Sequence, residues 1–277
     1  MNIIKFLDEF KTDNLTKTMS SRRDAFNTFG SLGKKAAIAA VPFGIATMGN
    51  KAKAATFVQQ DYIASLQLAL TLEYLEAEFY LKALDSGVLM DNAKAEAIYQ
   101  QISQHETAHV AFLQDQLGDN SVDSPEFDFT AGGAFDPFND NNSGPEVAYA
   151  QLLALAQAFE DTGVRAYKGQ AGNLMGVADG AVLTAALQIH SVEARHASEI
   201  RRLRTLDGWI TLNERGEGMP PQTQDVYEGE ENLSHAGVDV TTLGDGDPFS
   251  AEASSQAYDE PMSAETATNI AGLFIVS

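Results

Sequence analysis

The sequence predicts an all-α fold in which four helices form a bundle and an irregular C-terminal extension follows. Apolar residues recur at a period near 3.6 in four segments of the 277-residue chain, as they do along one face of a helix. Residues 73–109 and 160–196 both read Glu-x6-Tyr-x25-Glu-x2-His, so the bundle has two similar halves. A long polar stretch, residues 118–144, lies between them. We therefore assign residues 55–205 to the bundle and residues 206–277 to the extension.

We expect the helices over residues 58–84, 92–117, 145–168 and 180–204. Pro145 followed by Glu146 is a favourable start for the third helix. Turn-forming residues cluster between the first and second helices and between the third and fourth; they are Ser86, Gly87, Asp91, Asn92, Gly169, Gly172, Asn173, Gly176 and Gly180. Each half is therefore expected to be an antiparallel helical hairpin.

The polar stretch, residues 118–144, is long enough to cross the whole bundle. A helix of about 26 residues is roughly 39 Å long, and an extended chain of similar length spans about twice that distance. Four phenylalanines are the expected anchors; they are Phe127, Phe129, Phe135 and Phe138. A crossover of this kind makes the second and third helices parallel.

The extension, residues 206–277, differs in composition from the bundle because Gly, Asp, Ser and Pro are frequent in it. Only the stretch after Pro261 favours a helix. We expect an irregular segment that packs on the bundle, the alternative being a disordered tail. Nothing in it carries recognisable chemistry.

Residues 1–54 have the features of an export signal. Ser-Arg-Arg at residues 21–23 precedes an apolar run, residues 36–48, and the small-residue site Ala-Lys-Ala at residues 52–54. The paired arginines resemble those of the twin-arginine pathway. We expect cleavage after Ala54, a periplasmic or otherwise exported protein, and no stable membrane span after cleavage. An amphipathic N-terminal helix and an uncleaved anchor are the alternatives, although the apolar run is short for a span.

Charge and cysteine content narrow the classes of partner. Without its first 54 residues the chain carries 9 Lys and Arg against 35 Asp and Glu, a net charge near −26. Such a surface repels nucleic acid and anionic membranes and attracts cations. The chain has no Cys, which excludes disulfides and thiolate metal ligands.

Six residues of the two halves are candidate metal ligands: Glu73, Glu106, His109, Glu160, Glu193 and His196. Residues three apart lie on one helix face, so the Glu and His of each Glu-x-x-His pair can hold one ion together, and the lone Glu completes the set from a neighbouring helix. Four carboxylates and two neutral imidazoles roughly neutralise two divalent cations, and these ligands suit iron or manganese. Carboxylates buried on an apolar stripe are costly without protons or cations. The alternative is a chance spacing within a helical core.

This arrangement resembles the ferritin-like superfamily, in which two helices each supply a Glu and two each supply Glu-x-x-His. The resemblance covers roughly residues 57–205. Within the superfamily, the segment Leu-Glu-Tyr-Leu-Glu-Ala-Glu-Phe-Tyr at residues 72–80, the export signal and the extension look most like the desiccation-related ferritin-like branch. Members of that branch are mostly of undefined activity, so the resemblance implies a fold and a site more than a reaction.

The resemblance also implies a role for each candidate. The lone Glu of each half would be a terminal ligand, and the Glu of each Glu-x-x-His pair would bridge two iron or manganese ions, while each His binds one ion. Tyr80 and Tyr167 lie two turns beyond the lone Glu residues on the same face. Similar proteins often place there a tyrosine that hydrogen-bonds a ligand carboxylate. The alternative for each is an ordinary core aromatic residue.

Four further residues, one glutamate and three histidines, are not expected to be metal ligands. Glu76, one turn from the first lone Glu, is expected to be solvated rather than an extra ligand, because the repeat places Gly163 at the matching position. His190 is expected to be a structural histidine, the alternative being a partner of a ligand. His105 and His235 have no partner at helical spacing and are expected on the surface.

Three functional classes follow. The first is a metal-dependent oxidoreductase acting on oxygen, peroxide or ferrous iron. The second is a non-catalytic metal-binding stress or structural protein, which the acidic surface and the extension support. The third is an oxygenase for an organic substrate, which needs an apolar pocket beside the metals. We favour the first. Assembly into a homo-oligomer stays open, and the large extension argues weakly against a ferritin-type cage.

Overall fold

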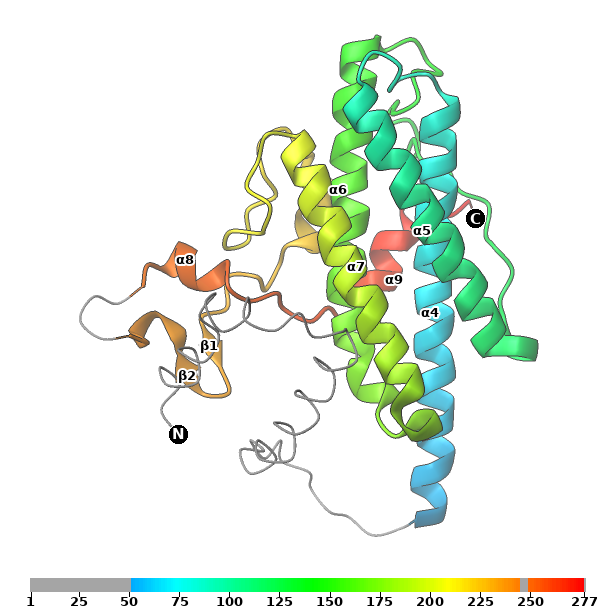
Figure 1. The fold of residues 1–277 in the computed structure, drawn as a ribbon, viewed down its shortest axis with the longest axis vertical. Coiled ribbons are helices and arrows are strands. Elements are labelled where there is room, and N and C mark those ends of the chain that lie inside the picture. Colours follow the sequence, from blue (N-terminus) through cyan, green and yellow to red (C-terminus); the bar gives the residue numbers. More distant parts are fainter. Residues whose placement is uncertain (1–50, 245–248, 277) are drawn as a thin grey trace, which may run out of the picture. The chain divides into compact units, whose positions relative to one another are not determined.

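Four long helices form the frame of the molecule and lie side by side in Figure 1. The structure is a computed structural model that describes residues 51–244 and 249–276, with side chains described from residue 61 onward. The helices are α4 (Lys51–Asp85), α5 (Ala93–Leu117), α6 (Pro145–Gln170) and α7 (Ala181–Leu203). Every boundary lies within two residues of its prediction except the start of α4, which is seven residues earlier. The predicted all-α bundle is confirmed.

The predicted export signal falls almost wholly on residues 1–50, which lie outside the described residues. Its expected cleavage point after Ala54 is within the beginning of α4. Among the helices that the structure describes, none combines the length and the apolar character needed to cross a bilayer. Export therefore stays a prediction.

Local chemistry explains why each hairpin turns where it does. The Asn92 side chain accepts a hydrogen bond from the backbone N–H of Ala95 and caps α5, which suits asparagine at a helix start. Between α6 and α7 the chain makes two 3₁₀ turns, Ala171–Leu174 and Val177–Gly180. Gly176 separates them at φ +77°, a backbone conformation that favours glycine.

The connection from α5 to α6 runs along the bundle, as contacts between these two helices show. Asn92, just before α5, donates to the Tyr149 hydroxyl at 2.9 Å, and the Tyr99 hydroxyl bonds the Leu152 carbonyl at 3.4 Å. Residue numbers rise together along the two helices, so α5 and α6 are parallel. The single long crossover between the second and third helices is therefore confirmed.

Phenylalanines anchor this crossover in the core, as predicted. Phe127, Phe129 and Phe135 are each at most 7% exposed, and Phe138 packs against the same cluster. The rings of Phe129 and Phe138 meet that of Phe79 of α4, at centroid distances of 5.4 and 5.7 Å. Burial of several aromatic side chains fixes the crossover because each one removes a large apolar area from water.

The extension packs on the bundle through helix α9 and the 3₁₀ helix Pro221–Val226. It contains the short antiparallel strands β1 (Ser234–His235) and β2 (Val238–Asp239) and the helices α8 (Ala251–Ser255) and α9 (Ala264–Gly272). Helix α9, which the sequence favoured, contacts both α4 and α6. The end of the chain returns to the crossover, where Ile275 forms a β-bridge with Phe127.

A buried arginine of α6 holds the extension in place. Arg165 is 2% exposed, and its Nε lies 2.6 Å from Glu230 Oε1. Its guanidinium also donates to backbone carbonyls of the extension, those of Val226, Glu228 and Glu260. Arginine suits this position because its planar fork carries five N–H donors in a fixed geometry.

Gly169 was predicted to belong to the turn after the third helix, and that prediction is wrong. It lies within α6, and a Cβ added there would be 1.8 Å from the Met262 carbonyl oxygen. The extension approaches the helix at this point, since the Met262 N–H donates to the Arg165 carbonyl at 2.9 Å. Glycine is needed because of this backbone contact between segments far apart in sequence.

We predict that Gly169→Ala lowers the free energy of unfolding by at least about 2 kcal/mol, in the upper part of the range for overpacked sites. Alanine ordinarily favours a helix over glycine, so the sign is diagnostic. Chemical denaturation measures the effect. The matched control is Gly172→Ala, because a Cβ there meets nothing within 4 Å. Equal stability of the two variants would contradict the close approach of the extension.

Candidate metal centre

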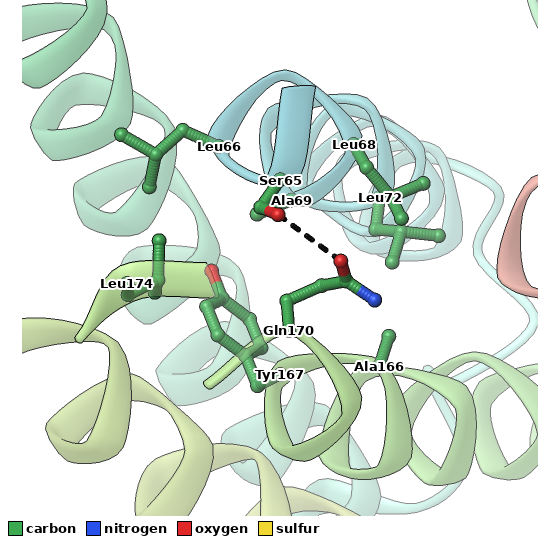
Figure 2. Close-up of a pocket in the computed structure, with 9 residues that line it drawn as sticks. All are labelled: Ser65, Leu66, Leu68, Ala69, Leu72, Ala166, Tyr167, Gln170 and Leu174. Carbon is green, nitrogen blue, oxygen red and sulfur yellow. Dashed lines mark hydrogen bonds between the residues drawn. The ribbon is translucent and has the colours of Figure 1, made fainter. Parts of the chain in front are cut away.

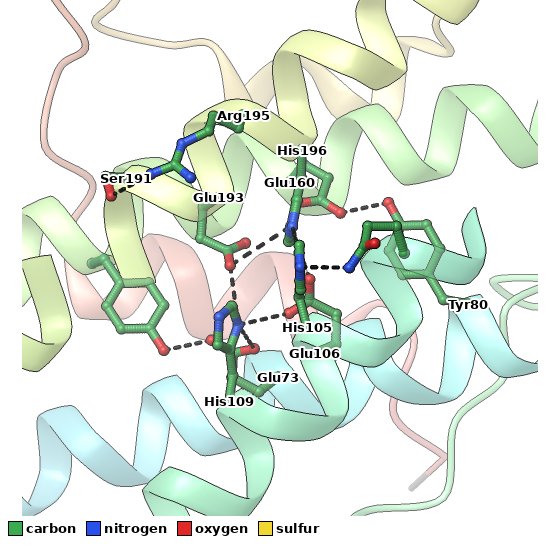
Figure 3. A network of polar contacts seen from close by, with 12 residues as sticks. Glu73, Tyr80, His105, Glu106, His109, Glu160, Ser191, Glu193, Arg195 and His196 are labelled. Carbon is green, nitrogen blue, oxygen red and sulfur yellow. Dashed lines mark hydrogen bonds and ion pairs between the residues drawn. The ribbon is translucent and has the colours of Figure 1, made fainter. Parts of the chain in front are cut away.

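The structure brings all six candidate ligands into one cluster between the four helices (Figure 3). Helix α4 supplies Glu73, α6 supplies Glu160, and α5 and α7 supply one Glu-x-x-His pair each. The four glutamates are fully buried, and the exposed fractions of His109 and His196 are 9% and 4%. Helical spacing and the antiparallel hairpins account for this convergence. That the six bind metal stays a prediction.

The cluster divides into two groups of potential ligands. Within each group one ligand atom per residue can be chosen so that all lie within 4.8 Å of one another. One group is Glu73, Glu106, His109 and Glu193, and the other is Glu106, Glu160, Glu193 and His196. We call them the His109 half and the His196 half. Glu106 and Glu193 belong to both.

Two tyrosines hold the lone glutamates from the opposite helix. The Tyr80 hydroxyl of α4 donates to Glu160 Oε1 at 2.5 Å, and the Tyr167 hydroxyl of α6 donates to Glu73 Oε1 at 2.5 Å. These two bonds are equivalent under the repeat and also show that α4 and α6 are antiparallel. Each bond leaves the second oxygen of its carboxylate directed to the cluster.

Several polar atoms at the centre lack hydrogen bonds among the described residues, which is the pattern that a metal ion would satisfy. They are Glu106 Oε1, Glu160 Oε2, both carboxylate oxygens of Glu193, and His196 Nδ1. His196 Nδ1 is only 2.9 Å from Glu106 Oε1 and 3.2 Å from Glu160 Oε2, yet neither contact has hydrogen-bond geometry. Converging lone pairs of oxygen and imidazole nitrogen fit iron or manganese.

Burial and mutual repulsion dominate the acidity of the carboxylates. Burial first, and then the charge of Glu106, raise the pKa of Glu73 to about 8. The same two causes raise the pKa of Glu193 well above its ordinary value, and burial raises that of Glu160. Burial also acts to raise the pKa of Glu106, but the hydrogen bond with His109 and the close contact of His196 outweigh it and lower the pKa to about 2.

The pKa values of the two histidines are also raised, although burial acts to lower them. Burial acts to lower the pKa of His109, but hydrogen bonds with Glu106 and Glu73 outweigh it and raise the pKa to about 10. For His196, burial is likewise outweighed, first by the charge of Glu160, and the pKa is again about 10. The cluster therefore attracts positive charge strongly, as protons when no cation is present.

Glu76 was expected to be solvated, and that expectation is wrong. It is 2% exposed, and burial followed by the charge of Glu160 raises its pKa well above the ordinary value. A Cβ at Gly163 would lie 2.9 Å from Glu193 Oε2 and 3.2 Å from Glu76 Oε1. The glycine of one half therefore leaves room for an additional carboxylate from the other half. The signal in the sequence that could have revealed the burial of Glu76 was the glycine, Gly163, at the matching position of the other half.

His105 was expected on the surface without a partner, but it is half-buried and has one. Its Nδ1 lies 2.9 Å from His196 Nε2, and the two rings stack with an interplanar angle of 13° (Figure 3). Its Nε2 lies 2.8 Å from the side-chain nitrogen of Gln101. Burial, and then His196, lower the pKa of His105. Sequence reasoning missed it because its partner is on another helix and follows no local spacing.

The two remaining histidines lie away from the cluster. His190 Nδ1 is 2.9 Å from the Val164 carbonyl oxygen, which matches the expected structural histidine. His235 stacks on Tyr258, with ring centroids 3.8 Å apart, and its side chain is 21% exposed. It is therefore less exposed than a surface histidine was expected to be.

Two cavities bear on what could reach the cluster. A cavity of about 10 Å³ lies between α4 and α6 beside Tyr167 and offers space for about one water molecule (Figure 2). An apolar cavity of about 200 Å³ lies between the crossover, α6 and the extension, near Phe159 and Phe274. None of the six candidate ligands lines either cavity. These two cavities therefore give no support to an organic substrate held against the cluster.

We predict that the metal-free protein is less stable at pH 8 than at pH 6.5. The contribution of Glu73 is fully present below pH 4.5 and is lost as pH rises through about 8, because its folded pKa is raised. The contributions of His109 and His196 are present below pH 6.5 and are lost through about pH 10. Thermal unfolding after chelation should show a lower midpoint at pH 8. The double variant Glu73→Gln/His109→Gln should show a smaller difference between the midpoints at the two pH values. A difference equal to that of the wild-type protein would contradict the assignment of the pH dependence to these residues.

Comparison with known families agrees with the geometry of the bundle. Residues 61–206 match the model of the family described as ferritin-like domain, and these residues are more than half of the chain. The comparison with curated proteins gives no match. The match covers α5, α6, α7, all of α4 from residue 61 onward, the crossover and every candidate ligand. The chain therefore belongs to the ferritin-like domain family.

Proposed function

We propose that this chain holds two adjacent iron or manganese ions and uses them for redox chemistry with oxygen, peroxide or ferrous iron. The observation that carries the proposal is that Glu106 and Glu193 belong to both halves of the cluster. Carboxylates with two oxygens can bridge two ions, whereas Glu73 and Glu160 each belong to one half. Each half also has its own histidine.

The chain's own residues set the conditions for this chemistry. When bound, a pair of such ions supplies two electrons to, or accepts them from, a small oxidant or reductant. Tyr80 and Tyr167 orient the terminal carboxylates, and full burial of the glutamates keeps bulk water from their oxygens. None of the six candidate ligands lines the two cavities described above, which suits a small inorganic reactant better than an organic one.

The buried charge favours a redox role over a purely structural one. With Glu76 the cluster contains five carboxylates, which carry five negative charges when ionised, against four positive charges on two divalent ions. The extra charge can be balanced by a proton or by one ion in the trivalent state. When Glu76 is ionised, this surplus charge would stabilise the oxidised state of the metals.

The alternative is a non-catalytic metal-binding stress or structural protein, as the resemblance to the desiccation-related branch implies. The acidic composition and the firmly docked extension support it, because neither is needed for small-molecule redox chemistry. We propose export for either function. The paired arginines are typical of a pathway that carries folded proteins, so metal can be bound before export.

Metal content of the purified protein tests the binding site. We predict about two iron or manganese ions per chain. The variant Glu106→Ala/Glu193→Ala should lose both ions, because it removes the two shared carboxylates. The variant Glu106→Gln/Glu193→Gln keeps the side-chain volume and serves the same test if the alanine variant fails to fold. Elemental analysis measures the content. The control Glu146→Ala/Glu199→Ala changes two exposed glutamates and should retain the metal. Absence of metal from the native protein would refute the proposal.

Turnover distinguishes the two functions. We predict that the metal-loaded protein consumes peroxide or oxidises ferrous iron, and that Glu106→Ala lowers the rate more than about 100-fold because it removes a ligand rather than only its outer partner. Oxygen-electrode and absorbance assays measure the rates. Two bound ions with no rate above that of the variant would favour the non-catalytic alternative.

A further inference from the structure

The two halves of the cluster differ in what supports their histidines from outside. In the His196 half, Nδ1 faces the carboxylates and Nε2 contacts His105 Nδ1 at 2.9 Å. The repeat places Val192 at the position that matches His105, and a valine side chain cannot accept a hydrogen bond. Among the described residues, no hydrogen bond is found for His109 Nε2. Only the His196 half therefore has an outer partner for its imidazole.

The halves also differ in the hydrogen bonds inside them. His109 Nδ1 is bonded to Glu106 Oε2 at 3.0 Å and to Glu73 Oε2 at 3.1 Å. In the His196 half, by contrast, Nδ1, Glu106 Oε1 and Glu160 Oε2 have no hydrogen-bond partner among the described residues. An ion must displace hydrogen bonds to enter the His109 half. An ion that enters the His196 half meets lone pairs that no hydrogen bond occupies.

We propose that the His196 half binds the first ion and the His109 half the second, and that His105 is the positioning residue that makes the first step tight. The proposal rests on the proposed two-ion site and adds an order of loading to it. A metal-bound imidazole keeps its second ring nitrogen protonated, and an acceptor for that N–H fixes the ring plane and strengthens the ligand. His105 Nδ1 is placed to be this acceptor.

The arrangement also determines the protonation of the outer residues. If His196 Nε2 donates to His105 Nδ1, then the proton of neutral His105 is on its Nε2. That N–H needs an acceptor, which the oxygen of the Gln101 amide provides once the amide is turned. His196 then donates to His105, and His105 donates to Gln101, so the chain of hydrogen bonds runs outward from the site.

Stepwise titration of the chelator-treated full chain with Mn²⁺ tests this order. Calorimetry should resolve two steps, and electron paramagnetic resonance at one equivalent should show an isolated ion rather than a coupled pair. His105→Phe keeps a stacked ring but has no acceptor, and it should weaken the first step about 10- to 100-fold. His105→Asn carries an amide oxygen near the position of Nδ1 and should retain the wild-type affinity. His109→Ala should remove the second step only.

The possible failures are distinct from one another. A coupled-pair spectrum at one equivalent, an unchanged first step in His105→Phe, or loss of the first step in His109→Ala would overturn the order of loading or the role of His105. In all three cases the wild-type protein still binds two ions. Failure of the wild-type protein to bind Mn²⁺ would instead refute the proposed two-ion site itself.

Discussion

The burial of five carboxylates at one point of the bundle is the constraint on which the rest of the molecule depends. Each is at most 2% exposed, and an ionised carboxylate in such surroundings is unfavourable unless positive charge or hydrogen bonds compensate. The two histidines and two tyrosine hydroxyls supply part of this compensation. The remainder must come from protons or cations, so the uptake of protons or cations by this cluster is coupled to folding.

Such a cluster is useful only if its groups cannot relax away from one another, and helix α6 shows how this is prevented. Nearly every residue of α6 from Leu152 to Tyr167 is buried, because α4, α7, the crossover and the extension surround it. Arg165 ties the extension to this helix, and phenylalanines of the crossover cover another side. The extension therefore contributes to the rigidity of the site although it supplies no candidate ligand.

The sequence predicted what local periodicity determines and missed what distant segments determine. The four helices and the convergence of six residues follow from a period of 3.6 and from the repeat, because both act within one or two helices, and the crossover follows from the length of residues 118–144. The requirement for glycine at position 169 could not be predicted, because it comes from the close approach of the Met262 carbonyl, 93 residues away in the sequence. His105 was missed because its partner His196 is on another helix. Contacts of this kind leave no regular spacing.

The places where the repeat fails are as informative as the repeat itself. Glu76 is matched by Gly163, and His105 by Val192. A perfectly repeated site would bind two ions in equal surroundings, and neither ion would be oxidised in preference to the other. The additional carboxylate lies near Glu193, and the additional histidine supports the His196 half. In the proposed two-ion site, unequal surroundings would give the two ions different affinities and different potentials, so that the metals could enter and change oxidation state one at a time.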